Sequence, residues 1–173
     1  MSLVGKLIIS QSEISQEIDL ADLGFNIPNN SELKFAIAQS MVNAIVDRTL
    51  SNKDAFGSNF KSYSKEYINS LEFQAYDKSA GDVNLKLTGE MLDSIEVAST
   101  SGNKVVIRVM PDQAAKAFNH ITGDTVKKRN FFGVTEKEIN KIKKEFRSSV
   151  NDNTQAIDNK VIKLLGALGE LLK

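Results

Sequence analysis

Residues 31–50 read SELKFAIAQSMVNAIVDRTL, a run in which apolar side chains recur at the spacing of a helix. The apolar positions are Leu33, Ile37, Met41, Val42, Ile45 and Val46. The polar residues that we assign to the other faces are Lys34, Gln39, Asn43 and Asp47. Pro28, Asn29 and Asn30 precede the run, and an asparagine side chain can cap a helix start. We therefore predict one long amphipathic helix that packs on a sheet, although such a stripe can also line a groove for a partner.

Apolar segments on both sides of this helix predict the strands of that sheet. Residues 3–9 and a second segment that ends near Ile18 are separated by a polar turn. Residues 83–87 alternate apolar and polar side chains, and residues 95–97 and 105–109 flank the turn-forming run STSGN. Alternation indicates half-buried strands, and the last two segments indicate a β-hairpin. Together these patterns predict an α+β fold with a small antiparallel sheet.

Residues 51–76 separate the long helix from the alternating run. The first part, residues 51–62, is rich in Gly, Asn, Ser and Lys around Phe56 and Phe60, so we predict an ordered loop that these two rings anchor. Helical spacing then relates Tyr63, Tyr67 and Leu71. We expect one short helix in this second part.

Capping and helix-stopping residues predict two further short helices. Thr88 is placed to cap a helix that runs to Ser94. Pro111 ends the preceding strand, because proline cannot donate to a strand ladder, and residues 112–120 follow it as a helix.

The C-terminal part is predicted to be helical. Thr135 and Glu138 form a capping box, and the apolar positions after it are Ile139, Ile142, Phe146 and Val150. The polar residues 151–154 should interrupt or bend this helix. Beyond them lies a seam of Ile157, Val161, Leu164, Leu168 and Leu171. The seam is too short for an autonomous coiled coil, so we expect it to dock on the domain or on another subunit.

Length and composition restrict the function classes. A chain of 173 residues suits one compact domain, residues 1–173, in which residues 151–173 could form a helical extension. The 22 basic and 22 acidic side chains cancel, so no bulk field attracts DNA or anionic lipid. The absence of cysteine excludes disulfides and thiolate zinc sites. Residues 3–9 resemble a strand rather than a signal peptide, and no uncharged run approaches the roughly 18 residues of a membrane span. We expect a soluble, intracellular product.

Residues that could carry chemistry are few. His120 is the only histidine, and Asp112 or Asp124 could orient it in a hydrolase, but neither a nucleophile elbow nor an HExxH motif accompanies it. Glu90 and Asp93 are more typical of a solvated acidic pair than of a catalytic one. The glycines stand singly at predicted turns without the spacing of a phosphate-binding loop. We therefore expect a protein that is not an enzyme and needs no cofactor or metal.

Several phrases resemble tail-completion and head-tail joining proteins of tailed bacteriophages. In chain order, they are DRTL at 47–50, YSKEY at 63–67, VNLKLTGEMLDSI at 83–95, HITG at 120–123 and RNFFG at 129–133. The third phrase is similar to the family's apolar strand followed by a Thr/Ser-Gly-x-Met/Leu-Leu-x-Ser-Ile run. The last two are similar to the phrases that introduce the family's final helix. The phrases are short, and their common order carries the likeness.

The resemblance implies a structural virion protein, made in the host cytoplasm and located at the neck or tail of the particle. Such a subunit forms a homo-oligomeric ring, a hexamer or a dodecamer, whose contacts are heterologous. Its further partners would be the portal or head connector and the tail tube or tail terminator, with no membrane and no specific nucleic acid.

The interface or loop-anchoring residues that we predict are Arg129, Phe131, Phe132, His120, Lys127 and Lys128. An arginine and aromatic rings on one loop are typical interface anchors. Phe131 and Phe132 could equally be core residues. The alternative function is a small nucleic-acid-binding module that grips phosphates with the basic run Lys127-Lys128-Arg129.

Overall fold

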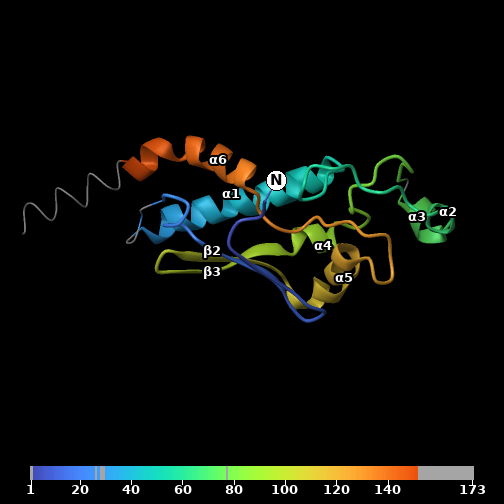
Figure 1. The fold of residues 1–173 in the computed structure, drawn as a ribbon. Helices are drawn as coiled ribbons and strands as arrows, with labels where there is room; N and C mark the ends of the chain where they lie inside the picture. The colour runs from blue at the N-terminus through green and yellow to red at the C-terminus, as the bar shows by residue number, and fades with distance from the viewer. Residues whose placement is uncertain (1, 26, 28–29, 77, 152–173) are drawn as a thin grey trace, which may run out of the picture.

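A computed structural model describes residues 2–25, 27, 30–76 and 78–151 of the chain. Its strands are β1 (Lys6–Ile9), β2 (Ile14–Asp19), β3 (Ile95–Ser101) and β4 (Lys104–Val109). Its helices are α1 (Ser31–Leu50), α2 (Lys65–Ile68), α3 (Leu71–Ala75), α4 (Glu90–Asp93), α5 (Pro111–Thr122) and α6 (Glu136–Glu145). The strands form one antiparallel sheet in the order β1-β2-β4-β3. The predicted α+β fold, a long helix on a small antiparallel sheet, is therefore confirmed (Figure 1).

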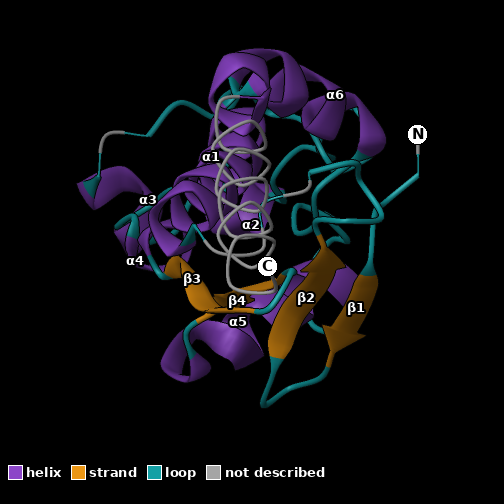
Figure 2. Cartoon of the chain, turned by 90° about the vertical axis from the view of Figure 1, so that its left-hand side faces the viewer, coloured by secondary structure: helices purple, strands orange, loops and turns teal. Residues whose placement is uncertain are grey.

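The two faces of the sheet differ in chemistry. Side chains on the inner face come from paired positions of β2 and β4, namely Ile14, Gln16, Ile18, Val105, Ile107 and Val109. Helix α1 covers this face and contacts β3 and β4 (Figure 2). The outer face carries two ion pairs, Lys104–Glu17 at 2.8 Å and Arg108–Glu96 at 2.7 Å. The alternation of the strands thus separates an apolar core from a charged surface.

Helix α1 has the predicted bounds and cap. Asn30 Oδ1 accepts a hydrogen bond from Leu33 N at 2.9 Å. Lys34, which the spacing assigns to a face other than the apolar stripe, is nonetheless only 5 % exposed. Its ammonium group donates to the carbonyl oxygen of Gly102 in the β3–β4 turn at 2.6 Å, so the long apolar stem lies over the sheet edge.

The predicted strand at residues 83–87 is not formed. Val83 and Leu85 are buried, as the alternation suggests, but Leu85 has a φ of 56°, which no strand accommodates. The carbonyl oxygen of Lys86 accepts from Lys78 Nζ instead of from a neighbouring strand. The alternation of apolar and polar residues therefore indicated correctly which side chains are buried, but the segment is irregular and not a strand.

Helix α4 follows this segment but begins one residue later than Thr88 implied. Gly89 is the N-cap residue, with a φ of 99°, and Thr88 Oγ1 accepts only a long bond of 3.4 Å from Glu90 N. The helix ends before Ser94, close to the predicted position.

Residues 63–76 form two short helices instead of one. Ser64 caps α2 and Ser70 caps α3 through their hydroxyl groups, and the second cap breaks the predicted helix. Phe73 is buried, whereas Leu71, which the helical spacing placed on the inner stripe, is 86 % exposed.

The loop before these helices is anchored by one of its two rings. Phe60 is buried, but Phe56 is 47 % exposed, so its predicted anchoring role is wrong. Asp54 Oδ1 accepts from the amides of Phe56 and Ser58, which fixes Phe56 in an exposed tight turn.

The β-hairpin and the helix after it are confirmed. Strands β3 and β4 pair from Ile95–Val109 to Ser101–Lys104, with a bulge between Val97 and Ser99. Helix α5 starts at Pro111 and contacts β2, β4 and α4, which closes this end of the sheet (Figure 1).

Helix α6 begins with the predicted capping box of Thr135 and Glu138. It ends at Glu145, Phe146 interrupts it as the C-cap residue, and residues 147–151 are helical again. The interruption thus lies five residues before the predicted polar run, of which residues 152–154 fall outside the described residues, as does the seam at 157–171. Within the described part, none of the helices has the length and apolar character that crossing a bilayer requires.

Candidate functional site

Three of the resemblance phrases, DRTL, YSKEY and HITG, contact the segment that contains the last one, residues 127–135, which we call the strap. It connects α5 to α6 and crosses beside α1 (Figure 1). Phe131 and Phe132 of the strap are completely buried, and their rings meet edge to face with centroids 6.4 Å apart. Of the two roles open to these phenylalanines, the structure gives them the core role, so neither ring can reach a neighbouring subunit.

Arg129 is the buried cation of the strap. Arg129 is only 4 % exposed. Its guanidinium group donates to the carbonyl oxygen of Lys61, at 3.0 and 3.2 Å, and to that of Lys127, at 3.3 Å. The group also lies 4.9 Å from the centre of the Tyr63 ring. Among the described residues no carboxylate forms an ion pair with it, and burial lowers its pKa. Arg129 therefore joins the strap to residues 61–63 and is held by carbonyl dipoles and an aromatic face.

Arg48 of α1 fixes the other end of the strap. One guanidinium nitrogen donates to Phe131 O at 2.6 Å and Gly133 O at 3.0 Å, and another pairs with Glu138 Oε1 at 2.5 Å. The second carboxylate oxygen of Glu138 accepts from the amide and hydroxyl of Thr135. Sequence reasoning quoted Arg48 in a resemblance phrase but missed this role, because its partners lie more than 80 residues away.

Gln16 is a second residue that sequence reasoning missed. It is completely buried on the inner face of β2, and its amide accepts from Val134 N at 2.8 Å and donates to Val4 O. A polar residue at an inward strand position was the available signal. Gln16 thus joins the strap to the N-terminal segment across the sheet.

Among the described residues, none forms the hydrogen bond to the His120 imidazole that catalysis would require. The carbonyl oxygen of His120 accepts from Arg129 N at 2.6 Å, whereas its side-chain Nδ1 is buried and has no hydrogen-bond partner among the described residues. Burial, together with the positive charges of Arg129 and Lys116, lowers the pKa of His120 to about 4. The imidazole is therefore neutral at pH 7, and neither Asp112 nor Asp124 forms the hydrogen bond that a charge-stabilised triad requires.

The basic run 127–129 does not form one cationic patch. Arg129 points inward, Lys127 and Lys128 are exposed, and Lys127 Nζ donates to Ser62 O at 2.9 Å. Lys128 also packs against Gly123, which has a φ of 79° and would place an added Cβ 2.8 Å from the Lys128 side chain. Only two of the three charges can therefore meet a phosphate without opening the loop.

A cavity of about 500 Å³ lies between α2 and residues 123–129. Tyr63, Tyr67, His120 and Arg129 contribute to its wall, and a second hollow of about 290 Å³ shares the first three of these. Burial raises the pKa of Tyr63 to about 12, and both tyrosine rings contact Phe73 edge to face. The described residues contain no group of three or more side chains that could hold a metal ion. The walls of the two hollows thus include aromatic rings and a neutral imidazole, which are suited to packing against another surface.

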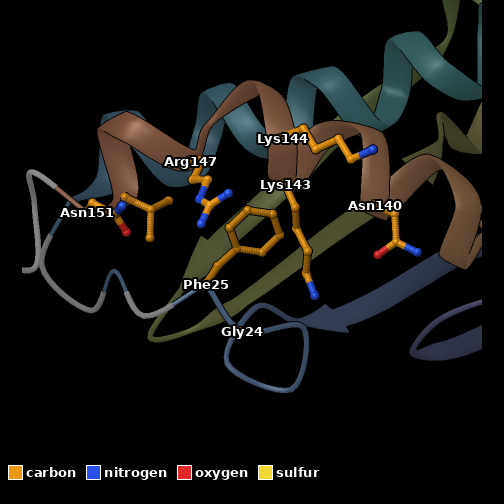
Figure 3. A pocket seen from close by; sticks show the side chains of 8 residues that line it. Gly24, Phe25, Asn140, Lys143, Lys144, Arg147 and Asn151 are labelled. Atoms are coloured by element: carbon orange, nitrogen blue, oxygen red, sulfur yellow. The ribbon is translucent and has the colours of Figure 1, made fainter.

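A separate groove of about 560 Å³ lies at the opposite end of the molecule, between the Gly24–Phe25 turn and α6. Figure 3 shows the Phe25 ring between the side chains of Lys143 and Arg147, with Lys144 and Asn140 farther along the helix. None of the described residues that line this groove carries a carboxylate. It is therefore a cationic groove, and because Phe25 is only 2 % exposed, its apolar lining comes from Val150 and the aliphatic stems of the basic residues.

Comparison with known proteins found no matching family model, no matching curated protein and no matching solved structure. The assignment of a function therefore depends on the residues and their arrangement.

Proposed function

We propose that this chain is a structural subunit of a tailed bacteriophage particle. Copies of it would form a ring at the neck or tail end, which completes the tail or joins the head connector to it. The subunit would act through its shape and not through a chemical reaction. The buried polar side chains of Arg48, Arg129 and Gln16 would keep that shape rigid by fixing the strap.

The observation that carries this proposal is the meeting of the resemblance phrases. Arg48 of the first phrase binds the backbone of the last, and Tyr63 of the second lies under Arg129 of the last. The HITG phrase adds His120 O, which accepts from Arg129 N, and Gly123, which admits Lys128. Four of the five phrases, which span residues 47–133, are thus joined in one connected set of contacts, which we call the clasp and which supports reading them as a single family pattern.

The surface supports an assembly role as well. Four of the nine large apolar side chains that are exposed among the described residues lie in the segment between the end of α1 and the end of α3, namely Leu50, Phe56, Leu71 and Tyr76. This segment projects from the sheet and α1 on the side of α2 and α3 (Figure 1). Exposed apolar groups gathered on a projection are typical of surfaces that become buried in a complex.

Deleting the gene from the phage or prophage genome that carries it tests the proposal. We expect filled heads and separate or incomplete tails in electron micrographs, and restored particles when the chain is supplied from a plasmid. Complete, infectious particles in the absence of the chain would contradict the proposal.

A further inference from the structure

We propose that the contact between neighbouring copies is made by the tip of one subunit and the groove of the next. The tip is α3 with Tyr76, residues 71–76, and the groove is the cationic hollow between Phe25 and α6 described above. This inference rests on the proposed function, because it names the partner as a second copy of this chain.

The tip presents an apolar and acidic surface. Leu71 is 86 % exposed and Tyr76 is 54 % exposed, and Glu72 is exposed between them. Helix α3 contains no basic residue. Phe73 is buried against Tyr63 and Tyr67, which holds the helix in place while its outer side chains point away. The outer side chains are thus presented from a fixed backbone, which lowers the entropic cost of docking.

The groove has the complementary chemistry. The Phe25 ring beneath it is only 2 % exposed, so its apolar lining comes from Val150 and from the aliphatic stems of Lys143, Lys144 and Arg147. The charged ends of these three residues make its walls cationic, with no carboxylate among the described lining residues. A leucine with a neighbouring glutamate therefore matches the groove in apolar area and in charge. Burying an exposed leucine favours association, and the cations add orientation rather than bulk affinity.

The positions of the two surfaces determine the kind of assembly. The tip lies beyond one end of the sheet and the groove lies at the other, at the C-terminal half of α6 (Figure 1). A contact between different faces of identical subunits is heterologous, and its repetition gives a ring or an open filament instead of a two-fold dimer. The net charge of zero is also consistent with this contact, because it leaves little electrostatic repulsion between copies of the chain.

Cross-linking between introduced cysteines tests the contact, since the natural chain has none. The full-length double variant Leu71→Cys/Asn140→Cys, treated with a short bismaleimide, should give a ladder of trimers and longer products on a denaturing gel. The matched control is Leu71→Cys/Gln11→Cys, whose second site lies in the exposed β1–β2 turn. Each single variant should give at most dimers. The absence of a ladder from the first variant, or an equal ladder from the control, would overturn the proposal.

Mixing two defective subunits gives a second test. Leu71→Gln removes the apolar anchor of the tip without adding a charge, and Lys143→Glu/Arg147→Glu damages the groove alone. Light scattering after gel filtration should show a monomer for each variant and a 1:1 dimer for the mixture, because one intact tip then meets one intact groove. An unchanged oligomeric state in either variant, or no new species in the mixture, would overturn the proposed contact. Circular dichroism and the urea midpoint check that both variants are folded.

Failure of the contact and failure of the function can be told apart. If both tests fail while the gene deletion still leaves heads and tails unjoined, the function stands and the tip and groove are wrong. If particles are complete in the absence of the chain, the function is wrong whatever the cross-links show.

Discussion

Arg129 holds a buried positive charge with carbonyl oxygens and an aromatic face instead of a carboxylate. Its side chain joins the strap to residues 61–63, two segments that approach each other only in the folded chain. The planar guanidinium group makes this possible, because it can donate in several directions at once and stack on a ring. At the scale of the residue, then, the clasp depends on geometry more than on charge.

We predict that Arg129→Ala lowers the free energy of unfolding by about 2–4 kcal/mol, because buried carbonyl groups lose their donors. Arg129→Lys should recover less than half of this loss, since an ammonium group lacks the planar fork. Urea denaturation followed by circular dichroism measures both. The control Lys128→Ala, an exposed neighbour, should stay within about 0.5 kcal/mol of the wild type. A stable Arg129→Lys protein would show that charge alone suffices.

The depressed pKa of His120 predicts a loss of stability in acid. The folded state keeps the imidazole neutral down to about pH 4, whereas the unfolded chain takes up the proton near 6.5. The unfolded state therefore binds more protons between these values, and the free energy of unfolding falls as pH decreases through this window. The contribution is roughly 2 kcal/mol once partial solvent exposure is allowed for.

The variant His120→Gln cannot titrate, so comparing its urea midpoint with that of the wild type from pH 8 to pH 4 isolates this effect from the carboxylates. The difference between the two proteins should be constant above pH 7 and should change in favour of the variant below pH 6.5. Two parallel curves over the whole range would contradict the assigned pKa.

At the scale of the elements, Arg48 and Glu138 connect the two helices that enclose the strap. Their side chains are only 11 % and 16 % exposed, and Glu138 also closes the capping box of α6. The start of α6 is thus coupled to the end of α1, and the backbone of the strap is fixed between them. A defect in this pair should loosen both ends of the clasp.

A double-mutant cycle with Arg48→Ala and Glu138→Ala should give a coupling energy of about 1–3 kcal/mol, because the pair is mostly shielded from water. The matched control is the Lys104–Glu17 pair, whose side chains are 55 % and 43 % exposed. Exposed pairs couple by about 0.2–1 kcal/mol. If the two cycles gave equal coupling energies, the proposed role of the Arg48–Glu138 pair would be wrong.

The elements also show which features a sequence can predict. Helix α1 was predicted to both ends because its apolar spacing and its Asn30 cap are local properties. Residues 83–87 were predicted incorrectly, because a strand exists only if a partner strand pairs with it. In addition, Leu85 adopts a positive φ, which the identity of a leucine side chain does not predict. Ser70 caps α3 and so separates it from α2, which the helical spacing of the apolar residues did not predict.

The candidate site was predictable in part. The motif positions Arg129, Phe131 and Phe132 were found from the sequence, but an apolar ring is equally suited to a core and to an interface, so their burial needed the fold. The contacts of Arg48 and Gln16 with the strap join residues that are 83 to 118 positions apart, and no local sequence pattern predicts such pairs.

At the scale of the whole molecule, the sheet has one covered face and one charged face, and the proposed contact surfaces lie beyond its two ends (Figures 1 and 2). A subunit of this shape can contact two neighbours at once without using its core. The clasp of the strap, α1 and α6 holds the groove helix in place, and the aromatic cluster around Tyr63 holds the tip. The proposed assembly function therefore depends on rigid placement of two distant surfaces.

The central claim, that this chain is a structural part of a tailed particle, is tested most directly by quantitative mass spectrometry of purified, infectious particles. We predict that the chain is present at a fixed number of copies per particle, the number of a ring, and that it stays with the tail or neck fraction when particles are dissociated. Infectious particles that contain none of this chain would contradict the claim.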